Sequence, residues 1–119
     1  MSYHDPAKEP EAFYHGLLLG FTVSLYGSYE IQSNREAGLG RFDIMLIPND
    51  NQKLGILIEL KIKAEGETLE STAKKALQQI ETRRYAEIFQ QKNIKQIMKI
   101  GIGFAGKAFA LEYNLTDAA

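Results

Sequence analysis

The sequence predicts an α/β sandwich in which helices flank a central mixed sheet, in the order helix, three strands, helix, two strands. Two short apolar runs, GRFDIMLIP (40–48) and GILIELKIK (55–63), are joined by the polar loop PNDNQK and predict an antiparallel hairpin. A long amphipathic segment follows and provides a crossover to a parallel neighbouring strand. A chain of 119 residues, 45% of them hydrophobic, is predicted to form one domain over residues 1–119.

The first helix is predicted from Glu9 to about Tyr26, because apolar residues recur there at helical spacing and Pro10 suits a first turn. Residues 29–33 read as a strand, and the turn-rich sequence NREAGLG leads from it into the hairpin. The second helix is predicted between the loop AEGE and Lys92, with Asn93 ending it. The segments IKQIMKIGIGFAG and KAFALEYN then predict a buried strand, a Gly-Lys turn and a last strand.

Composition limits the functional classes. The chain has no cysteine, which removes disulfides and thiolate metal sites, so any metal must bind to oxygen or histidine. The apolar stretch at 17–26 is too short and too interrupted to span a bilayer, and we expect a cytoplasmic protein without membrane contact. A formal net charge of −1 gives no bulk support for nucleic-acid binding, which would need a local basic patch.

The hairpin carries charged residues at positions where strands are usually apolar. Glu59 and Lys61 alternate with apolar residues and share one face, and the antiparallel pairing brings Asp43 beside them. Carboxylates on adjacent strands suit Mg²⁺ or Mn²⁺, and a nearby lysine can orient a water or offset charge during phosphodiester hydrolysis. The same residues could instead form a solvated face, where a cross-strand ion pair stabilises by roughly 0.2–1 kcal/mol.

The spacing D-x(15)-E-L-K across a hairpin, after a helix bearing an acid, is similar to the PD-(D/E)XK nuclease superfamily. Five blocks in order carry the resemblance over almost the whole chain: EAFYHGLLLG, SNREAGLGRFDIMLIP, ILIELKIK, ALQQIETRRYAE and IMKIGIGFAGK. They resemble the nuclease-like domain found after an AAA-type ATPase-like domain in bacterial proteins. The resemblance implies a restriction-endonuclease-like core, nucleic acid (DNA above RNA) as partner, and an ATPase-like domain or protein as a second partner. One departure is Phe42, which stands where the superfamily often has proline.

The resemblance also implies roles for individual residues. Asp43 and Glu59 would bind Mg²⁺ or Mn²⁺, Lys61 would be the catalytic lysine, and Glu11 would be an additional acid. Gln79, in the helix motif completed by Ile80 and Tyr85, would contact phosphate or a water in the site. Contacts to nucleic acid are expected from Arg41, Lys63, Arg83, Tyr85 and His15.

Each of these residues also has an ordinary structural interpretation. Glu11 is a favourable acid in the first turn of a helix, His15 could be a packed residue, and Gln79 could be solvated. The basic residues could be solvated helix charges, and Tyr85 could belong to the core. Two other functions stay open: a catalytically silent interaction module with the nuclease fold, and a homodimer formed through the edge of the strands at 97–104 and 108–113.

Overall fold

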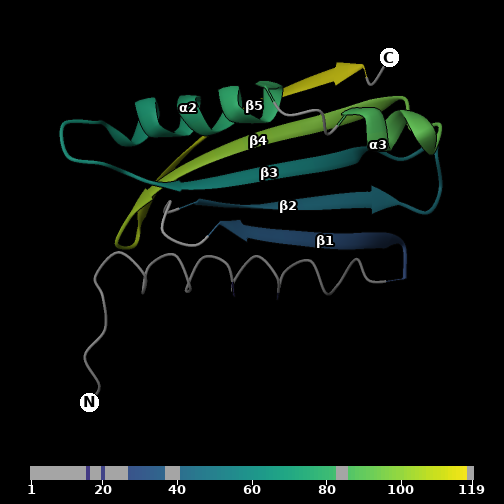
Figure 1. Ribbon diagram of the computed structural model, residues 1–119, viewed down its shortest axis with the longest axis horizontal. Helices are drawn as coiled ribbons and strands as arrows, with labels where there is room; N and C mark the ends of the chain where they lie inside the picture. Colours follow the sequence, from purple (N-terminus) through teal and green to yellow (C-terminus); the bar gives the residue numbers. More distant parts are fainter. Residues whose placement is uncertain (1–15, 17–19, 21–26, 37–40, 83–85, 118–119) are drawn as a thin grey trace.

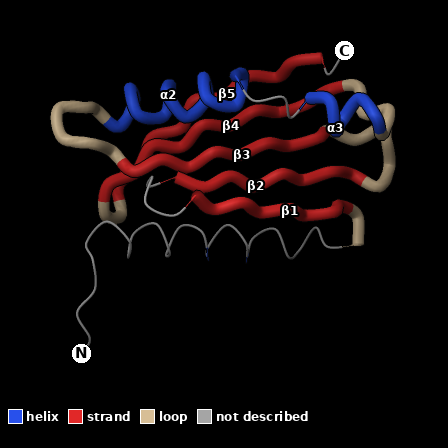
Figure 2. The backbone as a smooth tube through the Cα atoms, viewed as in Figure 1, coloured by secondary structure: helices blue, strands red, loops and turns tan. Residues whose placement is uncertain are grey.

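The computed structural model describes residues 16, 20, 27–36, 41–82 and 86–117, and it contains a five-stranded sheet with two helices (Figure 1). The strands lie in the order β1-β2-β3-β4-β5 (Figure 2). Of the four neighbouring pairs, β3 with β4 is parallel and the other three are antiparallel. Their bounds are β1 Tyr29–Glu36, β2 Arg41–Pro48, β3 Gly55–Ile62, β4 Gln96–Ala105 and β5 Ala108–Asp117. The predicted mixed sheet is confirmed, and β1 extends three residues beyond the predicted end at Ser33.

The helices are α2 (Leu69–Thr82) and α3 (Ala86–Gln91), within the stretch predicted as one long helix. Residues 83–85 between them lie outside the described residues. Gly16 and Gly20 are helical, and the rest of the predicted first helix is likewise outside the described part of the chain.

Local signals in the sequence explain both ends of the helical region. At the start of α2, the Ser71 N–H donates to the Thr68 hydroxyl at 3.0 Å, and the Thr68 N–H donates to the Ser71 hydroxyl at 3.1 Å. This reciprocal pair satisfies N–H groups that an uncapped helix would leave unbonded. At the end of α3, Asn93 has a φ of 60° and the Ile94 N–H donates to the Phe89 carbonyl at 3.0 Å, which is a Schellman motif. The prediction that Asn93 ends the helix is confirmed.

The two faces of the sheet form separate apolar clusters. Alternate residues of β2 and β3 pack with α2 and α3 on one face, which we call the helix face; its cluster is Met45, Ile47, Leu57, Ile80, Phe89, Ile94 and Ile97. The opposite face carries Ile44, Leu46, Ile58, Leu60, Ile102 and Phe104. Because strand side chains alternate, the pattern of buried residues on both faces explains why β2 and β3 read as nearly continuous apolar runs.

Two glycines of β4 let α2 lie directly on the sheet. A Cβ built on Gly101 would lie 2.4 Å from the carbonyl oxygen of Ala73, and one built on Gly103 would lie 2.6 Å from the carbonyl oxygen of Leu69. Both distances are shorter than van der Waals contact, so only glycine permits this approach of helix backbone to strand. The two glycines leave two successive positions on the helix face of β4 without side chains. The backbone of α2 can therefore lie close to the strand, and this contact sets the distance between the helix and the sheet.

Candidate active site

The site is built on the pairing of β2 with β3. In this antiparallel register Asp43 lies directly opposite Glu59, as the sequence predicted. Residues opposite each other on adjacent strands have Cβ atoms roughly 4.5–5.5 Å apart, so the two carboxyl groups share a small volume. Both side chains lie on the helix face, because Asp43 alternates with Met45 and Glu59 with Leu57, which pack there.

Both carboxyl groups are buried. Asp43 is 8% exposed and Glu59 is 1% exposed, so Glu59 ranks among the largest fully buried side chains of the described residues. A buried carboxylate costs several kcal/mol unless a cation or hydrogen-bond donors compensate it, and a second carboxylate opposite raises the cost. Two buried acids directly opposite each other on adjacent strands do not form a solvated hairpin face. The solvated-face interpretation therefore does not describe Asp43 and Glu59.

Lys61 follows Glu59 by two residues and lies on the same face, where it is partly buried. It lines an open depression of about 260 Å³ together with Lys75, Gln78 and Gln79. The last three residues come from α2, so the helix and the strand bring Lys61 and Gln79 to one place. The sequence could only suggest that Gln79 approaches from the helix, and the structure places it there.

The donor set fits a hard divalent ion. Mg²⁺ is usually held in proteins by one or two carboxylates, with waters and substrate phosphate completing its shell, and Asp43 and Glu59 supply that number. Within the described residues, no group of three or more histidine, aspartate or glutamate side chains could hold a metal. The third acid expected from the sequence, Glu11, lies outside the described residues.

The remaining predicted residues are placed less fully. His15, Arg83 and Tyr85 lie outside the described residues. Arg41 pairs in register with Lys61, which sets its backbone beside the site. Lys63 follows β3, and its ammonium donates to the carbonyl of Ala64 at 3.4 Å. Lys63 is not among the residues that line the depression.

Sequence reasoning missed two contributions to this geometry. The first is the close approach of α2 at Gly101 and Gly103, although glycine at alternate positions of an apolar strand is a recognisable signal for such an approach. The second is Glu67, which lies in the loop AEGE. It accepts hydrogen bonds from the Ala64 N–H at 3.0 Å and the Thr72 hydroxyl at 3.2 Å, and it forms an ion pair with Lys75. Glu67 thus ties the exit of β3 to α2 beside the depression.

These donors have an electrostatic consequence. The Lys75 ammonium, and then the Ala64 N–H, hold the pKa of Glu67 at about 2, below its ordinary value of 4.5. A carboxyl whose pKa is lower in the folded than in the unfolded protein stabilises the fold fully above its unfolded value. That contribution is lost as the pH falls from about 4.5 to about 2.

We therefore expect Glu67→Gln to lower the thermal unfolding midpoint at neutral pH, and the difference from wild type to shrink as the pH approaches 2. Thermal unfolding followed by circular dichroism across this range measures it. Glu65→Gln removes a carboxylate from an exposed position in the same loop and serves as the matched control. A Glu67→Gln deficit that stays constant down to the lowest pH would contradict the role of the ionised carboxylate.

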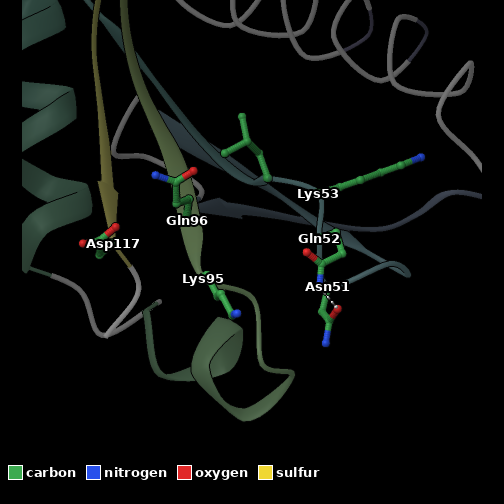
Figure 3. Close-up of a pocket in the computed structure, with 7 residues that line it drawn as sticks. Asn51, Gln52, Lys53, Lys95, Gln96 and Asp117 are labelled. Carbon is green, nitrogen blue, oxygen red and sulfur yellow. Dashed lines mark hydrogen bonds between the residues drawn. The ribbon is translucent and has the colours of Figure 1, made fainter.

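A second hollow of about 360 Å³ lies where the β2–β3 turn, the start of β4 and the end of β5 meet. Its polar residues do not converge on one point, since Lys53 extends away from Lys95 and Asp117 (Figure 3). It lies beyond the end of the β2–β3 hairpin opposite to Asp43 and Glu59, because the register places Leu46 and Ile56 between them and the turn. This hollow contains none of the predicted catalytic residues.

Comparison with protein-family models gives a match over most of the chain. A family model described as the PD-(D/E)XK nuclease superfamily matches residues 9–113, which is most of the chain. No curated protein matches the sequence significantly. Among the described residues, no helix is long and apolar enough to cross a membrane.

Proposed function

This chain belongs to the PD-(D/E)XK nuclease superfamily, and we propose that it is a metal-dependent nuclease that hydrolyses phosphodiester bonds in DNA. The observation that carries the proposal is the register of β2 and β3, which sets Asp43 opposite Glu59 with Lys61 on the same face. Burial of both acids supports it, because a bound cation would offset the repulsion between two carboxylates that lie opposite each other inside a small domain.

Asp43 and Glu59 would hold Mg²⁺ or Mn²⁺ through their carboxylate oxygens. When bound, such an ion polarises the scissile phosphate and lowers the pKa of a coordinated water. The two side chains come from adjacent strands whose backbones are fixed by the sheet, so the carboxylates are positioned before substrate arrives. Glu11 remains the predicted additional acid.

Lys61 supplies a cation within the same site. Its ammonium can hydrogen-bond the attacking water and orient it toward phosphorus, and it can offset negative charge that develops on the phosphate oxygens. Gln79 lines the depression with Lys61, and in this proposal its amide N–H donates to a phosphate oxygen. Hydrolysis then forms a bond from the water oxygen to phosphorus, breaks one ester P–O bond, and delivers a proton to the leaving oxygen.

Contacts to the DNA backbone would come from basic residues around the site, not from net charge, which is −1. Arg41 has its backbone beside Lys61, and Lys63 follows at the end of the strand. Arg83, Tyr85 and His15 complete the predicted contacts. Contacts to phosphate fix the position of the protein on the DNA backbone. They carry little sequence information, so they would not by themselves recognise a particular base sequence.

Cleavage and metal binding, measured together, test the proposal. Wild type should cut linear, circular or single-stranded DNA in Mn²⁺ or Mg²⁺, and calorimetry should detect the ion. Asp43→Asn keeps the size of the side chain and removes its charge, and it should lose both signals while remaining folded. Cleavage by Asp43→Asn at the wild-type rate would contradict the proposal. A folded wild type that neither binds the ion nor cuts would favour the silent interaction module.

A further inference from the structure

The edge strand β5 carries a row of exposed apolar side chains. Phe109, Leu111, Tyr113 and Leu115 are 57%, 49%, 67% and 49% exposed, and they alternate with half-buried residues along the strand. Alternate residues of a strand share one face, so the four form a continuous stripe, which we call the β5 stripe. Monomeric proteins rarely expose such a contiguous patch, and when they do it usually marks an interaction surface.

The β5 stripe extends one of the apolar faces of the sheet. In the β4–β5 register Phe109 lies opposite Phe104, and Leu111 lies opposite Ile102. Phe104 and Ile102 belong to the buried cluster on the face opposite the helices. The apolar surface of this face therefore continues from β4 onto the edge strand β5, where it is exposed to solvent.

The strand has few of the devices that usually protect an edge, its charged residues being Glu112 and Asp117. Among the described strands β5 lies at the edge of the sheet and pairs only with β4 (Figure 2). It runs for 10 residues. Its sequence, AFALEYNLTD, contains no proline, lysine or arginine, the residues with which proteins commonly block edge-to-edge pairing. An unblocked edge combined with an apolar stripe favours the addition of another strand.

The charge of this surface indicates whether nucleic acid or a protein strand would bind to the β5 stripe. Exposed aromatic residues on a sheet can stack on bases, but such surfaces combine stacking with basic residues that contact the backbone. Strands β3, β4 and β5 place no lysine or arginine on this face. The chemistry of the surface is therefore that of an apolar protein interface.

We propose that β5 pairs antiparallel with β5 of a second copy of this chain, forming a homodimer with a continuous ten-stranded sheet. Self-pairing about a twofold axis at Glu112 makes the β5 stripe complementary to itself. The register sets Ala108 against Thr116, Phe109 against Leu115, Ala110 against Asn114, and Leu111 against Tyr113. Every pair on the stripe is then apolar, and the partner strand satisfies backbone groups along the open edge.

Charge complementarity supports the same register. Lys107, in the turn before β5, meets Asp117 at the other end of the copy's strand, and symmetry makes this contact twice. The two Glu112 carboxylates lie opposite each other at the axis, which weakens the pairing. The register thus predicts opposite effects from neutralising different charges, which makes it testable.

The dimer has a consequence for the candidate active site, and this step alone depends on the proposed function. Glu112 pairs with Gly101, and Gly101 pairs with Glu59, so the twofold axis is level with the carboxylate pair along the strand direction. An axis perpendicular to the sheet keeps both helix faces on one side. The two sites would then lie on the same face of the dimer, six strand spacings or about 30 Å apart, facing one extended substrate.

Sedimentation of the full chain over a wide range of concentration tests the dimer without reference to activity. Wild type should show a reversible monomer–dimer equilibrium. Tyr113→Lys places a charge in the middle of the β5 stripe and should weaken the dimer at least about tenfold. Gln32→Lys places the same charge on an exposed position of the other edge strand and is the matched control, expected to dimerise as wild type does. Thermal unfolding of each variant shows that it is folded.

A charge swap tests the register. Lys107→Asp and Asp117→Lys should each weaken the dimer, and the double variant should recover it, whereas Glu112→Gln should strengthen it. A monomer at every concentration would overturn the proposal, and it would leave a partner of different sequence as the occupant. A dimer that Tyr113→Lys leaves intact would equally overturn it, because the interface would then lie elsewhere.

Discussion

Lys61→Ala is expected to yield a folded protein that still binds Mn²⁺ but cleaves DNA more slowly, by roughly 10²–10⁴-fold. The expectation rests on the position of Lys61, which shares the face of Glu59 and lines the depression together with Gln79. In the proposed mechanism its ammonium would act on the attacking water and the scissile phosphate. Truncation removes that cation without removing either carboxylate, so the rate falls while affinity for the ion is retained.

The controls separate catalysis from general electrostatics. Lys53→Ala removes the same charge from the β2–β3 turn, at the end of the hairpin away from Asp43 and Glu59, and should cleave at the wild-type rate. Single-turnover cleavage and calorimetry with Mn²⁺ measure the two properties separately. If Lys61→Ala bound Mn²⁺ and cut DNA as fast as Lys53→Ala, the assignment of the lysine would be wrong.

Gly101→Ala is expected to destabilise the fold by about 3 kcal/mol. In most strands a glycine-to-alanine change stabilises slightly, because it restricts the unfolded chain. Here the new methyl group would lie 2.4 Å from the Ala73 carbonyl oxygen and 2.5 Å from the Leu77 backbone nitrogen. Neither backbone atom can move alone, so α2 must lift from the sheet and lose packing along its length.

The site should be disturbed along with the fold, because α2 carries Gln79 to the depression. Gly101→Ala should therefore also cleave more slowly per folded molecule. Denaturant unfolding gives the stability change, and Gly20→Ala is the matched control, since its position is helical and a Cβ there meets nothing within 4 Å. That control should be neutral or stabilising by up to about 1 kcal/mol. A Gly101→Ala protein as stable as Gly20→Ala would show that the close approach is not required.

Much of the fold follows from local patterns in the chain. The apolar runs at 40–48 and 55–63 have strand character on both faces, and the short, mostly polar segment between them leaves room only for a hairpin. Asn93 ends the helical region because its backbone takes a positive φ, and Gly106 begins the turn between β4 and β5 for the same reason. The pairing of Asp43 with Glu59 also follows locally, since the length of the connecting loop sets the register.

Other features could not be read from the sequence. The prediction ended β1 at Ser33, but the strand continues to Glu36 because its partner β2 offers hydrogen-bonding groups as far as Arg41. The segment SNRE is entirely polar, so it lacks the alternation of apolar and polar residues from which a strand is predicted. Similarly, nothing local marks Glu67 as an acid with a strongly lowered pKa, because its Lys75 partner is eight residues away and reaches it only once α2 is capped at Thr68.

The sequence by itself determined the family, through blocks that match it in order along most of the chain. It also determined the mixed sheet, because a long helical segment between two strands provides a crossover to a parallel neighbour. The adjacency of Asp43, Glu59 and Lys61 follows from alternation along two strands and from one short loop. The tertiary structure alone decided where α2 lies, and with it whether Gln79 reaches the strand that carries Lys61. That placement depends on two backbones meeting at Gly101 and Gly103. Contacts between segments distant in the chain are set by packing, which no local pattern encodes.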